Sequence, residues 1–428
     1  MKSTMFNTLK DVYSWLDSIP MFGNVGVAAA DFSLDSISEF CEMMGNPQNQ
    51  FPSIHVAGTN GKGTTCQMLA SVYQSAGYKT GLYTSPHLLD YRDRFKIDAS
   101  SISESDLVLF FQTFEDELLK KELTYFELST AIAFWHFNHQ SVDIAIIETG
   151  LGGRLDATKI INPLVSVITS VGLDHTDILG DTIEQIAAEK AGIIKPNTPV
   201  VIGNLSSEAE LVVATVAEKQ NSDIVTFNEL DPQFSSNEII LETVDGTLKI
   251  DANNRSKIDT VNCAMAYQAV KLIKKQFPIE NNMFKKGIEM MSIRFPIHAH
   301  FERLDKSMDW YFDGGHNSQS ISIMIKELQE KAPLDQWTLV LSVMKDKLNP
   351  EIVSLLQGFK SVYVYPQKSA RGATVNQMKE FFPDAAELGA EEHLPKDWLE
   401  KHKSELVIFG GSFYFYSIVR RWMGAIAT

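Results

Sequence analysis

Short apolar segments alternate with helix-like segments through the first half of the chain. The segments expected as buried strands are 53–57, 79–84, 143–148, 164–169 and 199–202. The spacing of apolar residues between them predicts helices over 62–76, 104–120, 126–139 and 182–194. Ser103 and Asp106 form an expected capping pair for the second of these helices. Near-continuous apolar strands that alternate with helices predict a parallel sheet covered on both faces.

The pattern changes in the middle of the chain. Residues 238–250 alternate around Asp245-Gly246, which predicts a β-hairpin, and helices are expected over 261–275 and 282–291. Phe295-Pro296 then interrupts the pattern, so we place a boundary between domains 1–296 and 297–428. Beyond it, a second and smaller α/β domain is expected from strands at 310–313, 337–343, 361–365 and 405–409.

Composition narrows the class of protein. The 428 residues are 44% hydrophobic and 21% charged, as in soluble globular proteins. The formal net charge of −16 argues against a general binder of nucleic acid or membrane surfaces. No apolar stretch suits a membrane span or a signal peptide, and the three distant cysteines suggest neither disulfides nor a zinc site. We expect a cytoplasmic monomer whose partners are small molecules, without nucleic acid or membrane.

The strongest chemical signal is the run Gly58, Thr59, Asn60, Gly61, Lys62, Gly63, Thr64. It follows an expected strand and opens an expected helix, as phosphate-binding loops do. Glycines let backbone N–H groups turn toward phosphate oxygens, Lys62 would reach the β- and γ-phosphates of ATP, and Thr64 could bind Mg²⁺. The match is imperfect, since no glycine stands five residues before Gly61 and Gly63 precedes the threonine. A glycine-rich turn with an exposed lysine is the alternative, but the position after the strand favours the phosphate loop.

Polar residues follow other expected strands. In parallel sheets, ligand sites lie at the carboxyl ends of the strands. Glu148 and Ser85 stand at such ends and offer the hard oxygen ligands that suit Mg²⁺, although a solvated carboxylate and a turn residue before Pro86 are the plain alternatives. His175 also follows an apolar strand, but a lone histidine is more often structural than a ligand. Lys190 alone is typical of a surface lysine on a helix.

Several segments together resemble the Mur ligase superfamily, and in particular its folylpolyglutamate synthase and dihydrofolate synthase branch. They occur in the expected order as HVAGTNGKGTT (55–65), YTSPH (83–87), LTYFE (123–127), ETGLGGRLDAT (148–158), GLDHT (172–176), EKAGIIKP (189–196), DGGHN (313–317) and GSFY (411–414). The resemblance implies a P-loop α/β ATP-binding domain followed by a Rossmann-like glutamate-ligase domain, with the site in the cleft between them. It also implies an ATP-dependent amide ligase that joins L-glutamate to dihydropteroate or tetrahydrofolate through an acyl phosphate.

The resemblance also implies roles for individual residues. Asn262 and Asp313 would contact ATP besides the loop, and His316 would lie near the reacting groups. The nucleotide-associated Mg²⁺ would be held by Thr64, Ser85 and Glu148, and a second metal by Glu148, His175 and Lys190 as a carbamate. The expected pterin contacts are Thr124, Phe126, Asp156 and Ala157. Phe126 could equally belong to the core, and Ser412, a candidate at the glutamate end, could cap the last helix.

Two departures from the family pattern concern the nucleotide site. Ile258-Asp259 stands where the family has His-Gln, and Ala299-His300 where it has Gly-Arg. The residues that could replace the missing arginine are His300, Arg303 and Arg294. The departures favour, as a rival, a nucleotide-binding module without ligase activity. The nearer rival is a ligase restricted to folylpolyglutamate or to dihydropteroate, and a Mur-type amino-acid ligase is more distant.

Overall fold

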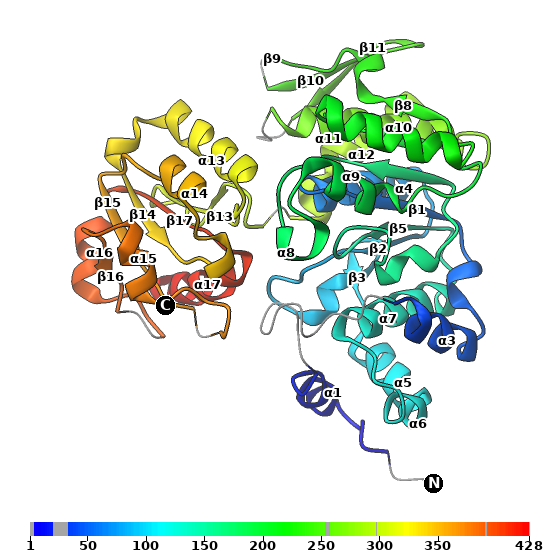
Figure 1. Cartoon of the computed structure of the whole chain (residues 1–428), viewed down its shortest axis with the longest axis horizontal. Coiled ribbons are helices and arrows are strands. Elements are labelled where there is room, and N and C mark those ends of the chain that lie inside the picture. The colour runs from blue at the N-terminus through cyan, green and yellow to red at the C-terminus, as the bar shows by residue number, and fades with distance from the viewer. Residues whose placement is uncertain are drawn as a thin grey trace. The chain divides into compact units, whose positions relative to one another are not determined.

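The computed structural model describes residues 4–19, 33–235, 237–252, 257–296, 298–367, 369–389 and 392–427. These residues form two compact units that divide after Pro296 (Figure 1). Each unit is built on its own sheet, and we describe them separately.

The first unit is built on an eight-stranded sheet with the order β4-β3-β2-β5-β1-β6-β7-β8. Its strands are β1 (Ser53–Ala57), β2 (Thr80–Tyr83), β3 (Phe95–Ile97), β4 (Ser100–Ser101), β5 (Ile144–Glu148), β6 (Val165–Ile168), β7 (Val200–Ile202) and β8 (Ile224–Thr226). Pairing is parallel from β2 to β8, which confirms the predicted parallel sheet, while β3 and β4 add antiparallel pairs at one edge. The prediction lacks β3, β4 and β8, which are only two or three residues long.

Helices and short 3-10 turns connect these strands. The helices are α1 (Leu9–Leu16), α3 (Asp35–Met43), α4 (Lys62–Ser75), α5 (Glu104–Thr113), α6 (Glu115–Leu118), α7 (Tyr125–His139), α8 (Thr176–Leu179), α9 (Ile183–Ala191), α10 (Ser207–Lys219), α11 (Asp259–Leu272) and α12 (Asn281–Arg294). The 3-10 turns are η2 (Pro47–Asn49), η3 (Tyr91–Arg94), η4 (Ala157–Ile160) and η5 (Phe227–Leu230). Ser103 caps α5 as expected, because its Oγ accepts a hydrogen bond from Asp106 N at 3.0 Å. The expected single helix over 104–120 is wrong, since the chain breaks at Phe114 into α5 and α6.

Apolar side chains join the helices to the sheet in separate clusters. Phe110 of α5 and Phe134 of α7 are fully buried in one cluster with Ala145 of β5. Ile186 of α9 and Ala209 of α10 belong to another, which includes residues of β1, β6 and β7. Burial of this apolar surface is the main stabilising contribution to the unit. It fixes the carboxyl ends of the central strands, from which the candidate site projects.

A small antiparallel sheet, β9 (Gln233–Ser235), β10 (Glu238–Thr243) and β11 (Gly246–Asp251), completes the first unit. Thr243 pairs with Gly246, and Gly246 has φ +109°, so the turn uses a conformation that glycine adopts easily. The hairpin predicted around Asp245-Gly246 is therefore confirmed.

The second unit is a six-stranded sheet with the order β12-β13-β17-β14-β15-β16. Its strands are β12 (Glu302–Arg303), β13 (Trp310–Asp313), β14 (Trp337–Leu341), β15 (Ser361–Val364), β16 (Ala386–Glu387) and β17 (Leu406–Gly410). Its helices are α13 (Ser318–Lys331), α14 (Pro350–Leu355), α15 (Val375–Phe381), α16 (Lys396–His402) and α17 (Phe413–Ala427), with 3-10 turns η6 (Leu334–Gln336) and η7 (Lys345–Lys347). All pairs are parallel except β12 with β13, and the four predicted strands are confirmed.

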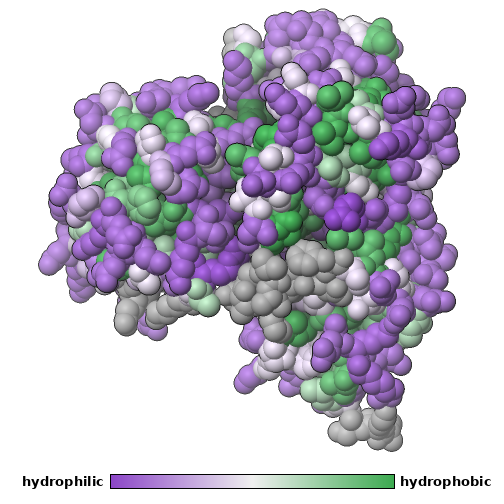
Figure 2. All heavy atoms as spheres, in the orientation of Figure 1, coloured by the Kyte–Doolittle hydropathy of each residue, from purple (hydrophilic) through white to green (hydrophobic). Residues whose placement is uncertain are grey.

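Hydrophilic residues dominate the visible face of the described chain, with smaller hydrophobic areas between them (Figure 2). Among the described residues, no helix has both the length and the apolar character needed to cross a membrane.

We predict that acid destabilises the first unit through the fully buried His55 on β1. Its Nε2 lies 2.8 Å from Thr158 Oγ1. Burial, followed by the charges of Lys195 and Lys159, lowers the pKa of His55 to about 3. The folded pKa is below the unfolded value of about 6.5, so the stability from neutral His55 is present above that value and is lost as the pH falls.

Urea unfolding at several values from about pH 7 to about pH 5 measures this effect. The free energy of unfolding of His55→Gln should depend on pH less steeply than that of the wild type. Below about pH 6, the slopes of the free energy of unfolding against pH for the two proteins should differ by about 1.4 kcal/mol per pH unit. Equal slopes for the two proteins would contradict the assignment.

Candidate active site

The loop after β1 lies against the end of β6 with no space for side chains. A Cβ atom at Gly58 would be 1.9 Å from Thr169 Oγ1. Gly61 has φ +83°, and a Cβ there would lie 2.7 Å from Asn262 Oδ1 of α11. Glycine is therefore required at both positions, for steric room at Gly58 and for room and backbone conformation at Gly61. The structure thus places Asn262 beside the loop, and its contact with ATP stays a prediction.

Hydrogen bonds from the end of β6 fix the loop. Ser170 O accepts from Thr59 N at 2.9 Å, and Ser170 Oγ accepts from Asn60 N at 2.9 Å. Thr169 Oγ1 donates to Asn60 O at 2.6 Å. Thr169 and Ser170 are absent from the predicted site residues, although two hydroxyl residues at the end of an apolar strand are a signal of a ligand site. These contacts make the loop a rigid platform.

Lys62 begins α4 and folds back over the loop. Its Nζ donates to Gly58 O at 3.0 Å and to Thr59 O at 3.2 Å. No side chain of the described chain caps α4, whose N-cap residue is Gly61. The first-turn N–H groups and Lys62 together create a positive electrostatic environment suited to an anion. Gly63 and Thr64 follow in this first turn.

Glu148 ends β5 beside the loop, as expected. Its side chain is 3% exposed, and Oε2 accepts a hydrogen bond from Ser85 N at 3.1 Å. A Cβ at Gly63 would lie 3.8 Å from the same oxygen, so the carboxyl faces the first turn of α4. Burial raises the pKa of Glu148 to about 7, against the opposing effects of Lys62, the Ser85 N–H and Arg94. Ser85, Glu148 and the phosphate loop are therefore brought together.

Lys190 is buried in α9, so the interpretation as a surface lysine is wrong. It is 3% exposed, and its side chain makes no hydrogen bond or ion pair with the described residues. Burial lowers the pKa of Lys190 to about 7, and the charge of Lys62 acts in the same direction, against Asp174 and Asp156. A substantial share of this amine is consequently neutral near pH 7.

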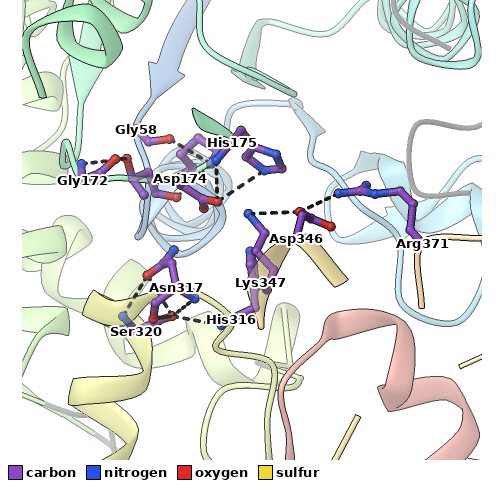
Figure 3. A network of polar contacts seen from close by, with 12 residues as sticks. Gly58, Gly172, Asp174, His175, His316, Asn317, Ser320, Asp346, Lys347 and Arg371 are labelled. Atoms are coloured by element: carbon purple, nitrogen blue, oxygen red, sulfur yellow. Dashed lines mark hydrogen bonds and ion pairs between the residues drawn. The ribbon is translucent and has the colours of Figure 1, made fainter. Parts of the chain in front are cut away.

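His175 begins α8 with φ +50°, a left-handed conformation. Its backbone N–H donates to Asp174 Oδ1 at 2.9 Å, and its ring Nε2 lies 3.8 Å from the same oxygen. Figure 3 shows this pair beside Gly58 and Gly172 of the loop region. The structure therefore places His175 near the phosphate loop, and the charge of Asp174 acts on both His175 and Lys190.

Close packing between the loop after β5 and α9 buries Lys190. A Cβ at Gly192 would lie 2.4 Å from Arg154 Cα, and one at Gly153 would lie 2.9 Å from Lys190 O. Arg154 N also donates to Glu189 O at 2.8 Å. Glycines at two positions let the two segments meet, which brings GGRLDAT and EKAGI together.

The four residues expected at the pterin have structural contacts of their own. Thr124 caps α7 through a reciprocal pair with Glu127, which is a T-x-x-E capping box. Phe126 packs on Gly150, where a Cβ would come within 2.4 Å of its ring. Asp156 accepts hydrogen bonds from Gly150 N, Leu151 N, Thr158 N and Thr158 Oγ1, which fill its acceptor capacity. Ala157 is 6% exposed at the start of η4.

The second unit carries Asp313, His316 and Ser412 at the ends of its strands. Asp313 is 8% exposed and accepts from Phe301 N at 2.9 Å and Gly315 N at 2.7 Å. Burial raises the pKa of Asp313, while His300, the two N–H groups and His316 oppose the shift. His316 Nδ1 lies 2.9 Å from Gly314 O, and Figure 3 shows the adjacent contacts of Asn317 with Ser320. Ser412 Oγ accepts from Tyr414 N at 3.2 Å, which supports the capping alternative.

Two of the three possible replacements for the missing arginine are already engaged. Arg294 Nη1 donates to Ser71 O at 2.7 Å and to Ser75 Oγ at 2.6 Å, both on α4. Arg303 Nη2 pairs with Asp309 Oδ1 at 2.8 Å. His300 instead acts electrostatically on Asp313, and its ring lies edge-on to Phe413 at 5.5 Å.

Comparison with known proteins gives consistent matches. Residues 56–265 match the Mur ligase middle domain. The chain is 32% identical to the folylpolyglutamate synthase of Lacticaseibacillus casei, over 88% of this chain and 91% of the relative. It is 29% identical to the dihydrofolate synthase/folylpolyglutamate synthase of Bacillus subtilis, over 97% and 99%. The structure of E. coli FolC in complex with DHPP and ADP aligns over 100% of both chains, with a TM-score of 0.85 and 27% identity.

We predict that the Thr169 hydroxyl stabilises the loop measurably. Thr169→Val removes the donor to Asn60 O but keeps a similar shape, so the free energy of unfolding should fall by about 1 kcal/mol. Thr169→Ser keeps a hydroxyl and is the matched control, expected close to wild type. Urea unfolding of the three proteins makes the comparison, and equal stabilities of the valine and serine variants would refute the role.

Proposed function

This chain belongs to the dihydrofolate synthase/folylpolyglutamate synthase family of Mur ligases, and we propose that it joins L-glutamate to a pteroate- or folate-type carboxylate at the expense of ATP. The observation that carries this proposal is the grouping of loop Lys62, carboxylate Glu148 and buried Lys190 at one edge of one sheet. Residues 1–296 supply the ATP-binding domain and 297–428 the glutamate-ligase domain.

ATP phosphates bind at the loop after β1. Backbone N–H groups from 61–64 and the Lys62 ammonium hold the phosphate oxygens, because both are positive donors on a rigid support. Asn262 supports Gly61 from α11. Asp313 of the second domain contacts the nucleotide, and His300 takes the place of the arginine.

The oxygen ligands near the phosphate loop fit one Mg²⁺ ion, and a second ion fits only if Lys190 becomes an anion. Among the described residues, no three His, Cys, Asp or Glu side chains form a ready-made metal group. Glu148 is nevertheless a buried carboxylate that faces the phosphate loop, and Thr64 and Ser85 add hydroxyls for a nucleotide-associated ion. A second ion needs Glu148, His175 and an anionic Lys190, and a neutral amine can form a carbamate with carbon dioxide. Bound Mg²⁺ would neutralise charge on the phosphates.

The reaction proceeds in two steps. A carboxylate oxygen of the folate-type substrate attacks the γ-phosphorus of ATP, and the bond to ADP breaks to leave an acyl phosphate. The neutral α-amine of glutamate then attacks the acyl carbon, loses a proton, and displaces phosphate from the tetrahedral intermediate. Lys62 and the loop N–H groups stabilise charge on the transferring phosphoryl group, and His316 lies near the reacting groups.

The proposed substrates are dihydropteroate, tetrahydrofolate or both. The B. subtilis relative carries both activities in its name, whereas the L. casei relative is named for folylpolyglutamate synthesis alone. Phe126 and the loop 150–158 would form the pterin pocket, with Asp156 holding the loop through its four hydrogen bonds. Ser412 is the residue proposed at the glutamate end, in addition to its capping contact.

ATP hydrolysis measured with each substrate tests the proposal. Release of ADP should require both glutamate and either dihydropteroate or tetrahydrofolate. Oxygen-18 in the substrate carboxylate should appear in the released phosphate, because the acyl phosphate transfers that atom. Turnover with only one of the two pteridine substrates would restrict the substrate range. ATP binding without turnover would favour the alternative function, a nucleotide-binding module without ligase activity, which the departures at Ile258-Asp259 and His300 suggest.

We predict that substitutions of Lys62 and Lys190 affect ATP binding differently, although both reduce ligation. Lys62→Ala should remove most ligation and weaken ATP binding, because charge on the phosphates loses its counterion. Lys190→Ala should lose ligation while ATP binding is retained, and short carboxylates such as acetate should partly restore activity by replacing the carbamate oxygens. Equilibrium binding of ATP and ligation rates, measured for both variants and the wild type, separate the two roles.

Carbon-13 spectra after addition of labelled bicarbonate provide a readout that does not depend on activity. Wild-type protein with Mg²⁺ should show a carbamate signal that Lys190→Ala lacks. A carbamate signal that persists in this variant, or full ligation without one in the wild type, would reject the modification.

A further inference from the structure

Arg94, the last residue of η3, is a buried cation surrounded by neutral groups. Its side chain is 7% exposed, and its Nε donates to His87 Nδ1 at 2.9 Å. The guanidinium carbon lies 5.9 Å from the ring centre of Tyr91 and 5.5 Å from that of Tyr125. Its remaining polar contact is with the phenol of Tyr83. No carboxylate of the described chain forms an ion pair with it.

The neighbouring Arg92 is arranged in the opposite way. Its Nη2 lies 2.8 Å from Asp90 Oδ2, and its Nη1 lies 3.3 Å from Glu104 Oε1. Asp90, the residue before η3, is thus committed to Arg92, and Asp93 within η3 instead accepts hydrogen bonds from Ser101 Oγ at 2.8 Å and Asp90 N at 3.4 Å. The chain neutralises the more exposed of two arginines two positions apart and leaves the buried one without a counterion.

A buried cation without an anion is costly. Removing a guanidinium from water costs several kcal/mol, and neutral donors and aromatic faces recover only part of that loss. His87 supplies no negative charge, because its ring Nδ1 accepts the hydrogen bond from Arg94 Nε as a neutral group. A site that holds such a charge in place is prepared for an anion that the chain does not contain.

The position of Arg94 indicates which anion this is. Tyr125, under the guanidinium, starts α7 between Thr124 and Phe126, where the pterin is expected, and Tyr83 packs on Phe126 with ring centres 6.0 Å apart. Arg94 also acts electrostatically on Glu148, which faces the phosphate loop. The guanidinium therefore belongs to the region that joins the pterin wall to the phosphates.

We propose that Arg94 binds the reacting carboxylate of the pteroate- or folate-type substrate. This inference rests on the proposed function. It adds a residue that selects and orients the substrate carboxylate that accepts the phosphoryl group of ATP. A planar guanidinium matches a carboxylate with two parallel hydrogen bonds, and three of its five N–H donors remain after the contacts with His87 and Tyr83. The pterin ring carries no negative charge, and Lys62 with the loop N–H groups already serves the phosphates of ATP.

The experiment compares dihydropteroate with its carboxyl methyl ester, which keeps the pterin and loses the charge. Equilibrium binding to the full-length protein, measured by quenching of intrinsic fluorescence, needs no turnover. Wild type should bind the acid more tightly than the ester by roughly ten- to a hundred-fold, as expected for a charge-assisted hydrogen bond. Arg94→Met keeps the length of the side chain and should bind both alike, and Arg94→Lys should retain part of the preference.

Arg92→Met is the matched control, because it removes a neighbouring guanidinium that is already paired. It should keep the wild-type preference for the acid. The KM for ATP should be unchanged in Arg94→Met, since a general loss of structure would alter it together with the binding of the acid. Circular dichroism and thermal unfolding establish that each variant is folded.

Two results would overturn the inference. The first is an Arg94→Met variant that still binds the acid more tightly than the ester. The second is a wild-type protein that binds acid and ester equally. This second result is decisive even if the methionine variant does not fold. A wild type that ligates glutamate normally in either case would leave the proposed function intact. A wild type that binds neither compound and shows no ligation would instead remove the proposed function, and this inference with it.

Discussion

The main chain after β1 comes so close to the end of β6 that no side chain fits between them. Because Gly58 has no Cβ, Thr169 and Ser170 come close enough to form hydrogen bonds with the loop. The absence of a side chain at Gly61 likewise leaves room for the side-chain amide of Asn262. The direction of α4 follows from this contact, because its first residue is Lys62. The loop is therefore held between the end of β6 and α11, and the other site residues of the first unit lie around it.

A second set of close contacts keeps charged groups out of water. Gly153 and Gly192 let the loop after β5 meet α9, and Asp156 ties that loop to itself. Lys190 is buried as a result, and Glu148 is buried at the end of β5. Their pKa values move toward neutrality from opposite directions, so each group can exchange its charge near pH 7 at little cost in free energy. Such groups suit a site that must accept metal, phosphate and carboxylate in turn.

The sequence predicts what depends on local pattern and misses what depends on distant packing. Apolar runs between turns identify the central strands, and glycines after a strand identify the phosphate loop. Lys190 looks like a surface residue because its burial depends on glycines at 153 and 192, which act through contact rather than through periodicity. Arg294 likewise looks available until its hydrogen bonds to Ser71 and Ser75 on α4 are known. Thr124 with Glu127 is different, since that capping box can be read directly from the sequence.

The local cations of the site have a consequence for how substrates arrive. The chain carries a formal net charge of −16, so ATP and folate-type anions approach against a repulsive field. Lys62 and Arg94 provide positive charge only at short range, and Arg94 is buried. Mobile salt ions screen the long-range field over about 8 Å at physiological ionic strength but act weakly on buried charges. Moderate salt should therefore speed the encounter of this protein with its anionic substrates, the reverse of what is found for enzymes that attract theirs.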